Sequence, residues 1–149
     1  TPHNMLEEMR KAAILARVAA RDINTVSTAD MLYAATVGGS NALLRQDLGR
    51  LAPGMKADIV LVDLECSDMI PVRDPLRSLV YHAAERAVRH VYVDGRQVVA
   101  DFKVLTLDQA DAAGRLAEAQ ARMLAAVRQR DYKARSAEDI VPLSLPIVC

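Results

Sequence analysis

Residues 48–63 read LGRLAPGMKADIVLVD and contain two glycines, a proline and an apolar run in a fixed order. Proline presets φ and glycine tolerates positive φ, so Pro53-Gly54 predicts a type II turn between two short antiparallel strands. We expect the first strand at residues 48–51. We expect the second at residues 57–63, where an apolar run is bounded by polar residues, as in a covered strand. The alternative interpretation of the same residues is an ordinary hairpin, as found in any α+β protein.

Two further segments flank this turn. Upstream, residues 35–43 read ATVGGSNAL, and downstream, residues 91–99 read VYVDGRQVV. The Asp94-Gly95 pair favours positive φ at both positions, which predicts a two-residue type I′ hairpin between strands at residues 88–93 and 96–101.

These three segments, in this order, resemble the small β-sandwich domain that accompanies the metal-dependent barrel of the amidohydrolase superfamily. The opening HNMLEEMR, residues 3–10, is similar to the segment after the last barrel strand in the branch of cytosine deaminase, S-adenosylhomocysteine deaminase and chlorohydrolases. The resemblance is firmest over residues 4–100. It implies an α/β fold with three parts: the last helices of a (β/α)₈ barrel at residues 1–46, a β-sandwich at residues 47–105 with a helix inserted at about 74–82, and a C-terminal helix with an extended tail at residues 106–149.

Length limits what the resemblance can mean. A (β/α)₈ barrel needs about 250 residues, and the chain has 149. The family's metal ligands, a His-x-His pair, further histidines and an aspartate, would lie on barrel strands upstream of Thr1. We therefore expect the C-terminal part of a longer enzyme, inactive by itself. Its expected partner is the N-terminal part of the same enzyme, and a homo-oligomer stays open.

Composition excludes several classes of protein. Nineteen basic and nineteen acidic residues balance, and the sequence contains one Phe, four Tyr and no Trp, so nothing favours nucleic acid. No apolar segment approaches the roughly 20 residues that cross a bilayer, so we expect no membrane partner. The two cysteines, Cys66 and Cys149, lack Cys-x-x-Cys spacing, which favours reduced thiols in a cytoplasmic protein.

Four helices are expected besides the strands. Asn4 and Glu7 have capping-box spacing and predict a helix over residues 5–21. Ser27 and Asp30 begin a second helix, which Gly38-Gly39 should end. Asp74-Pro75 has the form of an N-cap followed by proline at the first helical position.

The last helix is expected to begin at Thr106 with Gln109 and to be followed by an extended tail from Ala134. Its apolar residues recur at helical spacing and predict a buried stripe, which consists of Leu116, Ala119, Met123 and Val127.

Histidines are the first candidates for chemistry. His3, His82 and His90 lack His-x-His or His-Glu-x-x-His spacing, so we assign no metal ligand to this chain. His82 near a helix end and His90 on a strand are expected to be structural or exposed. The resemblance places His3 in the loop after the metal-binding aspartate, at the barrel mouth where active sites lie. His3 is therefore the candidate substrate contact, with a solvated loop residue as the alternative.

The acidic residues and glycines predict structural roles. Glu7 and Glu8 point about 100° apart on a helix and suit its N-terminal dipole, so they form no acid/base pair. Asp58 and Asp63 bracket a strand as turn and edge residues. Gly38-Gly39 and Gly49 lack the spacing of a phosphate-binding loop. We assign no catalytic residue to this chain.

The resemblance implies a hydrolase that removes amino or halide groups from nucleobases, nucleosides or triazines. Zinc or iron, held by residues upstream, would lower the pKa of a bound water toward ~7 and supply hydroxide. Two alternatives remain. One is a non-catalytic scaffold or interaction module that kept the fold, and the other is a hydrolase of cyclic amides or imidazolones from the same superfamily.

Overall fold

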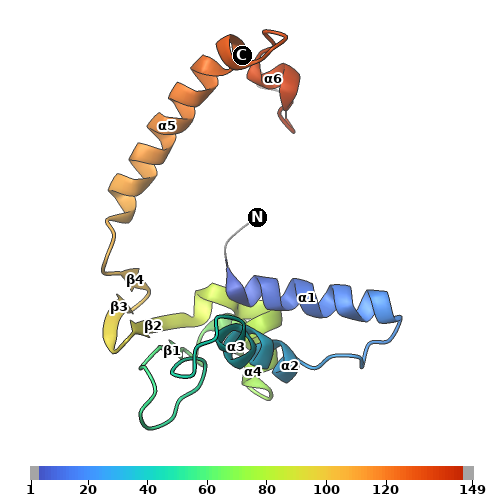
Figure 1. Ribbon diagram of the computed structural model, residues 1–149, viewed down its shortest axis with the longest axis vertical. Coiled ribbons are helices and arrows are strands. Elements are labelled where there is room, and N and C mark those ends of the chain that lie inside the picture. The colour runs from blue at the N-terminus through green and yellow to red at the C-terminus, as the bar shows by residue number, and fades with distance from the viewer. Residues whose placement is uncertain (1–3, 146–149) are drawn as a thin grey trace. The chain divides into compact units, whose positions relative to one another are not determined.

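The computed structural model describes residues 4–145, and its element order is given by the labels of Figure 1. The chain divides into two compact units, Thr1–Thr106 and Leu107–Cys149. The first unit contains helical segments and an antiparallel sheet, and the second contains two helices.

Helix α1 (Met5–Ala20) begins where the sequence predicts it. The Oδ1 atom of Asn4 accepts a hydrogen bond from the Leu6 N–H at 3.0 Å, which satisfies one of the free donors of the first turn. The predicted reciprocal bond from Glu7 is wrong. Glu7 instead lies 4.0 Å from Arg10 and 3.8 Å from Lys11, because two basic side chains follow it at helical spacing.

A continuous helical run follows, made of α2 (Thr28–Tyr33), the π-helical turn η1 (Ala34–Gly38) and α3 (Gly39–Ala42). Ser27 and Asp30 form the predicted capping box at its start. The prediction that Gly38-Gly39 ends the helix is wrong, since both glycines have φ −61° and continue it. Glycine ends a helix only where the chain turns to positive φ, and here the wider π turn carries the helix onward.

The turn at Pro53-Gly54 forms as predicted. Gly54 has φ +84°, and the Met55 N–H donates to the Ala52 carbonyl at 3.1 Å. The expected strand at residues 48–51 is absent. Gly49 instead lies against the helical run, where a Cβ on it would be 2.7 Å from the Thr36 carbonyl oxygen. Packing against a helix leaves this segment without a strand to pair with.

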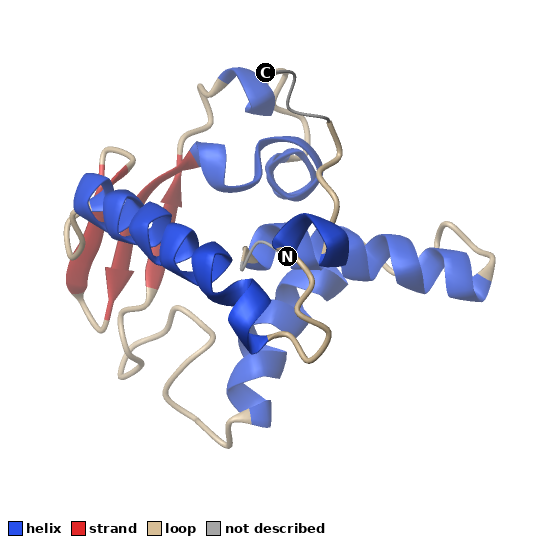
Figure 2. Cartoon of the chain, turned by 90° about the horizontal axis from the view of Figure 1, so that it is seen from above, coloured by secondary structure: helices blue, strands red, loops and turns tan. Residues whose placement is uncertain are grey.

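Four strands form one antiparallel sheet in the order β1-β2-β3-β4 (Figure 2). They are β1 (Ile59–Val62), β2 (Val88–Val93), β3 (Arg96–Ala100) and β4 (Lys103–Val104). Asp94 and Gly95 have φ 51° and 77°, which confirms the predicted type I′ turn. Strand β4 was not predicted, because Asp101-Phe102 takes positive φ at both residues without the usual turn sequence.

The segment after Asp74 forms the core of the first unit. Asp74 caps α4 (Pro75–Ser78) by accepting from the Arg77 N–H at 3.0 Å, as predicted. The helix continues through the π turn η3 (Leu79–Ala83) and ends close to His82 as predicted, because Ala84 leaves the helical conformation with φ 47°. The 3₁₀ turn η4 (Ala84–Ala87) follows it. Ala83 and Ala87 pack on Met69 of the 3₁₀ turn η2 (Ser67–Met69), next to partly buried side chains of Val62, Cys66 and Leu79.

The second unit differs from its prediction in three respects. Helix α5 (Gln109–Arg130) is capped by Asp108 rather than Thr106, since the Asp108 carboxylate accepts from two N–H groups of the first turn. A short helix α6 (Ala137–Ile140) replaces part of the expected extended tail, with a capping box between Ser136 and Asp139. The expected buried stripe is exposed, with Leu116 71% and Met123 59% accessible.

The described residues bury little apolar surface. Seven hydrophobic side chains are buried, and most are alanine or methionine, whereas 27 large hydrophobic side chains are exposed. The accessible surface is 11488 Å², while a monomer of 16.3 kDa exposes about 7,500 Å². Two separate compact domains of these sizes would together expose about 9,000 Å². The excess is too large to arise from the division into units alone.

Candidate functional site

The start of α1 is fixed to a distant part of the first unit. The Nδ2 group of Asn4 donates to the Glu85 carboxylate of η4, while its Oδ1 caps the helix. Six residues further along, Arg10 donates to the carbonyl of Tyr81 at 3.4 Å. The candidate substrate contact, His3, lies outside the described residues, and its role stays a prediction. Asn4, the next residue, is held by two hydrogen bonds, one to Glu85 and one from the Leu6 N–H.

The two glutamates of the first turn of α1 are used in surface ion pairs. Glu8 accepts from Lys11 at 2.9 Å, and Glu7 lies near Arg10 and the same lysine. Both carboxylates therefore face basic side chains of their own helix. Pairs at i,i+3 and i,i+4 on an exposed helix stabilise it by a few tenths of a kcal/mol.

The two histidines of the described chain lie in separate places. His90 lies on β2, and its Nδ1 accepts from the Asp101 N–H at 3.3 Å, so its role is structural as predicted. His82 is exposed at the end of the helix that begins with α4. Across residues 4–145 no three His, Cys, Asp or Glu side chains come together in a group that could hold a metal ion.

Asp58 and Asp63 hold turns, as the sequence predicts. Asp58 accepts from the Asp94 N–H at 2.7 Å and so ties the residue before β1 to the β2–β3 hairpin. Asp63 accepts from the Glu65 N–H at 2.9 Å just after the strand. Both carboxylates therefore accept hydrogen bonds from backbone N–H groups.

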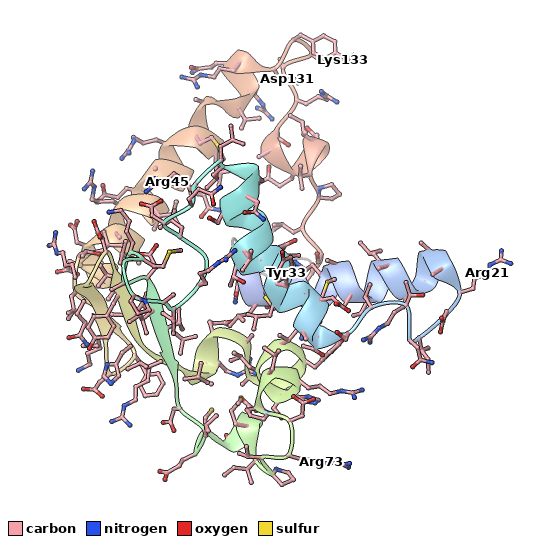
Figure 3. All side chains as sticks on the ribbon, turned by 60° about the horizontal axis from the view of Figure 1, so that its bottom comes forward. Arg21, Tyr33, Arg45, Arg73, Asp131 and Lys133 are labelled. Carbon is pink, nitrogen blue, oxygen red and sulfur yellow. The ribbon has the colours of Figure 1, made fainter. Side chains whose placement is uncertain are left out.

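An arginine fixes the loop before the Pro53-Gly54 turn. Arg45 donates from two nitrogens to the Asp47 carboxylate at 2.7 and 2.6 Å, and Figure 3 shows Arg45 on this loop. The hydrogen bond from Arg45 holds the pKa of the Asp47 carboxyl below its usual value. The Asp47 carbonyl accepts from the Lys56 N–H at 2.9 Å, which closes the loop around the turn.

Two features of the first unit were not predicted from the sequence. An apolar groove of about 270 Å³ lies between α1 and the helical run, lined by Met5, Met9, Ala12, Met31 and Ala35 among others. A second pocket, of about 370 Å³, is lined by Arg73, Arg77 and His82. Arg77 lies at the end of α4, His82 lies in the π turn η3, and Arg73 lies in the loop before them.

None of the helices in the described part of the chain combines the length and apolar character that a bilayer crossing requires.

Comparison with known proteins identifies the protein family of this chain. Residues 1–98 match the amidohydrolase family. The chain is 40% identical over 126 residues to a 5-methylthioadenosine/S-adenosylhomocysteine deaminase of Pelotomaculum thermopropionicum, covering 85% of this chain and 28% of that protein. It is 35% identical over 106 residues to a 5'-deoxyadenosine deaminase of Methanosarcina mazei, covering 71% of this chain and 24% of the relative.

Solved structures give the same result. An adenosine deaminase from Xanthomonas campestris with bound zinc aligns with a TM-score of 0.76 at 32% identity, over 80% of this chain and 27% of its own. Atrazine chlorohydrolase TrzN from Arthrobacter aurescens, complexed with zinc, aligns with a TM-score of 0.69 at 28% identity, over 76% of this chain and 25% of its own. The chain belongs to the amidohydrolase family. It spans about a quarter of the length of these relatives.

Proposed function

We propose that this chain is the C-terminal portion of a hydrolase that removes an amino group or a chloride from a nucleobase, nucleoside or triazine-like ring. The observation that carries the proposal is the 40% identity to a deaminase over 85% of the chain. Relatives named for deamination of 5′-modified adenosines recur among the similar proteins, so an adenine nucleoside is the substrate we favour.

In this proposal the chain supplies three structural parts of the enzyme. Residues 1–46 would be the last barrel helices, residues 47–105 the small sandwich, and residues 106–149 a C-terminal helix with its tail. The described residues offer no ligand set for the zinc seen in the neighbours, so we assign no metal-dependent step to them. Residues outside this chain would hold the metal.

The partner we propose is the N-terminal part of the same enzyme. Helix α1 supports this, because Met9 and Ala13 are buried on one side while Leu15 and Val18 are 67% and 68% exposed on the other. A helix that is apolar on two sides requires cover on both. Hydrogen exchange should show slow amides in α1 of the full-length enzyme and fast ones in the isolated chain. Equal protection in both would favour the self-sufficient scaffold.

Activity is tested on the full-length enzyme. S-adenosylhomocysteine, 5′-methylthioadenosine, 5′-deoxyadenosine and atrazine are supplied in turn, and released ammonia or chloride is measured. Turnover of an adenosine is expected, together with no turnover by the 149-residue chain alone. Turnover of a cyclic amide instead would support the second alternative. A full-length protein that binds zinc but hydrolyses none of these compounds would contradict the proposal.

A further inference from the structure

We infer that Arg73, Arg77 and His82 form a binding site for a phosphate group, separate from the proposed hydrolase function. The three side chains line one pocket of about 370 Å³, together with Pro71, Asp74 and Ser78. The whole chain carries no net charge, so two arginines and a histidine around one pocket are a local excess of positive charge.

The basic side chains of this pocket have no hydrogen-bond or ion-pair partner among the residues that the structure describes. Arg73, Arg77 and His82 donate no side-chain hydrogen bond and form no ion pair with any residue in the range 4–145, whereas arginines 45, 86, 89 and 135 are each paired with an aspartate. Figure 3 shows the Arg73 side chain extending away from the ribbon. Two unpaired guanidinium groups leave several N–H donors for an anion.

The carboxylate of the pocket is already engaged. Asp74 accepts from the Arg77 N–H at 3.0 Å as the N-cap of α4. Its negative charge lies at the pocket wall and lowers the net positive charge there, but it does not pair with the Arg77 guanidinium. Arg17, which lines the adjoining pocket with Arg77, is occupied by the Val26 carbonyl at 2.9 Å.

The backbone brings the donors to one face. In the π turn η3 the Ala84 N–H bonds to the Leu79 carbonyl, five residues earlier. Arg77 and Ser78 end α4, and His82 lies in the π turn that continues it. Ser78 and His82 are four residues apart, and all three line the pocket. A π turn is an irregular helical geometry that recurs at functional sites.

The chemistry of the donors selects the ligand. Guanidinium groups bind phosphate through paired N–H donors, and an imidazole and a hydroxyl add one bond each. The pocket, of about 370 Å³, can hold a phosphate group and leaves room beside it for a small organic group. The shared recognition element is the phosphate group, which either inorganic phosphate or a phosphate monoester could supply.

The test uses the full-length enzyme with ¹³C-labelled histidine, and the ring signals of His82 and His90 are assigned by replacing each residue with glutamine. Sodium phosphate is titrated at constant pH and constant ionic strength, balanced with sodium chloride, and the ring signals of His82 and His90 are followed by NMR. We expect a saturable shift at His82 and none at His90, which is bound to the β3–β4 turn. A parallel titration with ribose 5-phosphate distinguishes the two sources, since the tighter ligand identifies the free ion or the monoester.

Variants show whether the shift reports the pocket. Arg77→Gln and Arg73→Gln should each raise the dissociation constant for phosphate about tenfold, the effect of losing a charge-assisted contact. Arg96→Gln removes an exposed arginine outside the pocket and should leave binding unchanged, and circular dichroism confirms that all three variants fold. No saturable shift at His82, or equal weakening by Arg96→Gln, would overturn the inference.

Discussion

Gly49 and Gly54 have almost the same backbone conformation in very different surroundings, so replacing each with alanine separates strain from steric overlap. Their φ angles are +83° and +84°. A Cβ on Gly49 would lie 2.7 Å from the Thr36 carbonyl oxygen and 3.0 Å from the Ser40 Cβ, whereas a Cβ on Gly54 would meet nothing within 4 Å. Gly54→Ala is thus the matched control for Gly49→Ala.

The expected magnitudes follow from two separate costs. A non-glycine residue in the left-handed region costs about 1–2 kcal/mol, which both variants carry. Overpacking against atoms that cannot move away adds about 1–3 kcal/mol, and this applies to Gly49 alone because its neighbours are backbone atoms and a helical Cβ. We expect Gly54→Ala to lose about 1–2 kcal/mol and Gly49→Ala to lose about 2–5 kcal/mol of unfolding free energy.

Urea unfolding followed by circular dichroism measures both losses. With a slope of about 1–3 kcal/mol per molar urea, the midpoint of Gly49→Ala should lie at least about 0.3 M below that of Gly54→Ala. Equal midpoints would refute the close approach of residue 49 to the helical run. A Gly54→Ala variant as stable as the wild type would refute the turn.

Three further changes test other parts of the chain. Asn4→Ala removes a cap and the bond to Glu85 and should lower stability by about 1 kcal/mol in the same urea assay, and an unchanged midpoint would contradict the cap. Arg135 holds the pKa of the Asp131 carboxyl below its usual value, so this carboxylate stabilises the folded state fully above about pH 5 and progressively less as the pH falls below that. Asp131→Asn should therefore lower the melting temperature at pH 7 more than at pH 2, and an equal loss at both would count against the ion pair. In the full-length enzyme, His3→Ala should lower kcat/KM several-fold with an unchanged melting temperature, and unaltered kinetics would return His3 to a solvated loop.

Local sequence signals predicted much of the first unit. The Asn4 cap, the Ser27 capping box, the Asp74-Pro75 helix start and the Asp94-Gly95 hairpin all formed as expected. Each depends on a side chain and backbone groups within three residues of it. Such signals are readable without knowledge of the rest of the fold.

Signals that depend on distant contacts were misread. Glycines at 38 and 39 look like a helix end, yet a π turn carries the helix through them. Residues 48–51 resemble a strand in sequence, yet no strand forms there in the described structure, and Gly49 lies against the helical run. The pocket of Arg73, Arg77 and His82 was missed for a related reason, since it depends on how the loop before α4 lies against that helix.

The exposed apolar stripes connect these observations to function. Periodicity correctly located an apolar face on α5, but the described residues do not bury it. A periodic stripe shows that a face is meant to be covered, not that the same chain covers it. Helix α1 has such a face as well, since Leu15 and Val18 are exposed in its C-terminal half while Met9 and Ala13 are buried on the opposite side. We propose that the remainder of the enzyme packs on this exposed side of α1.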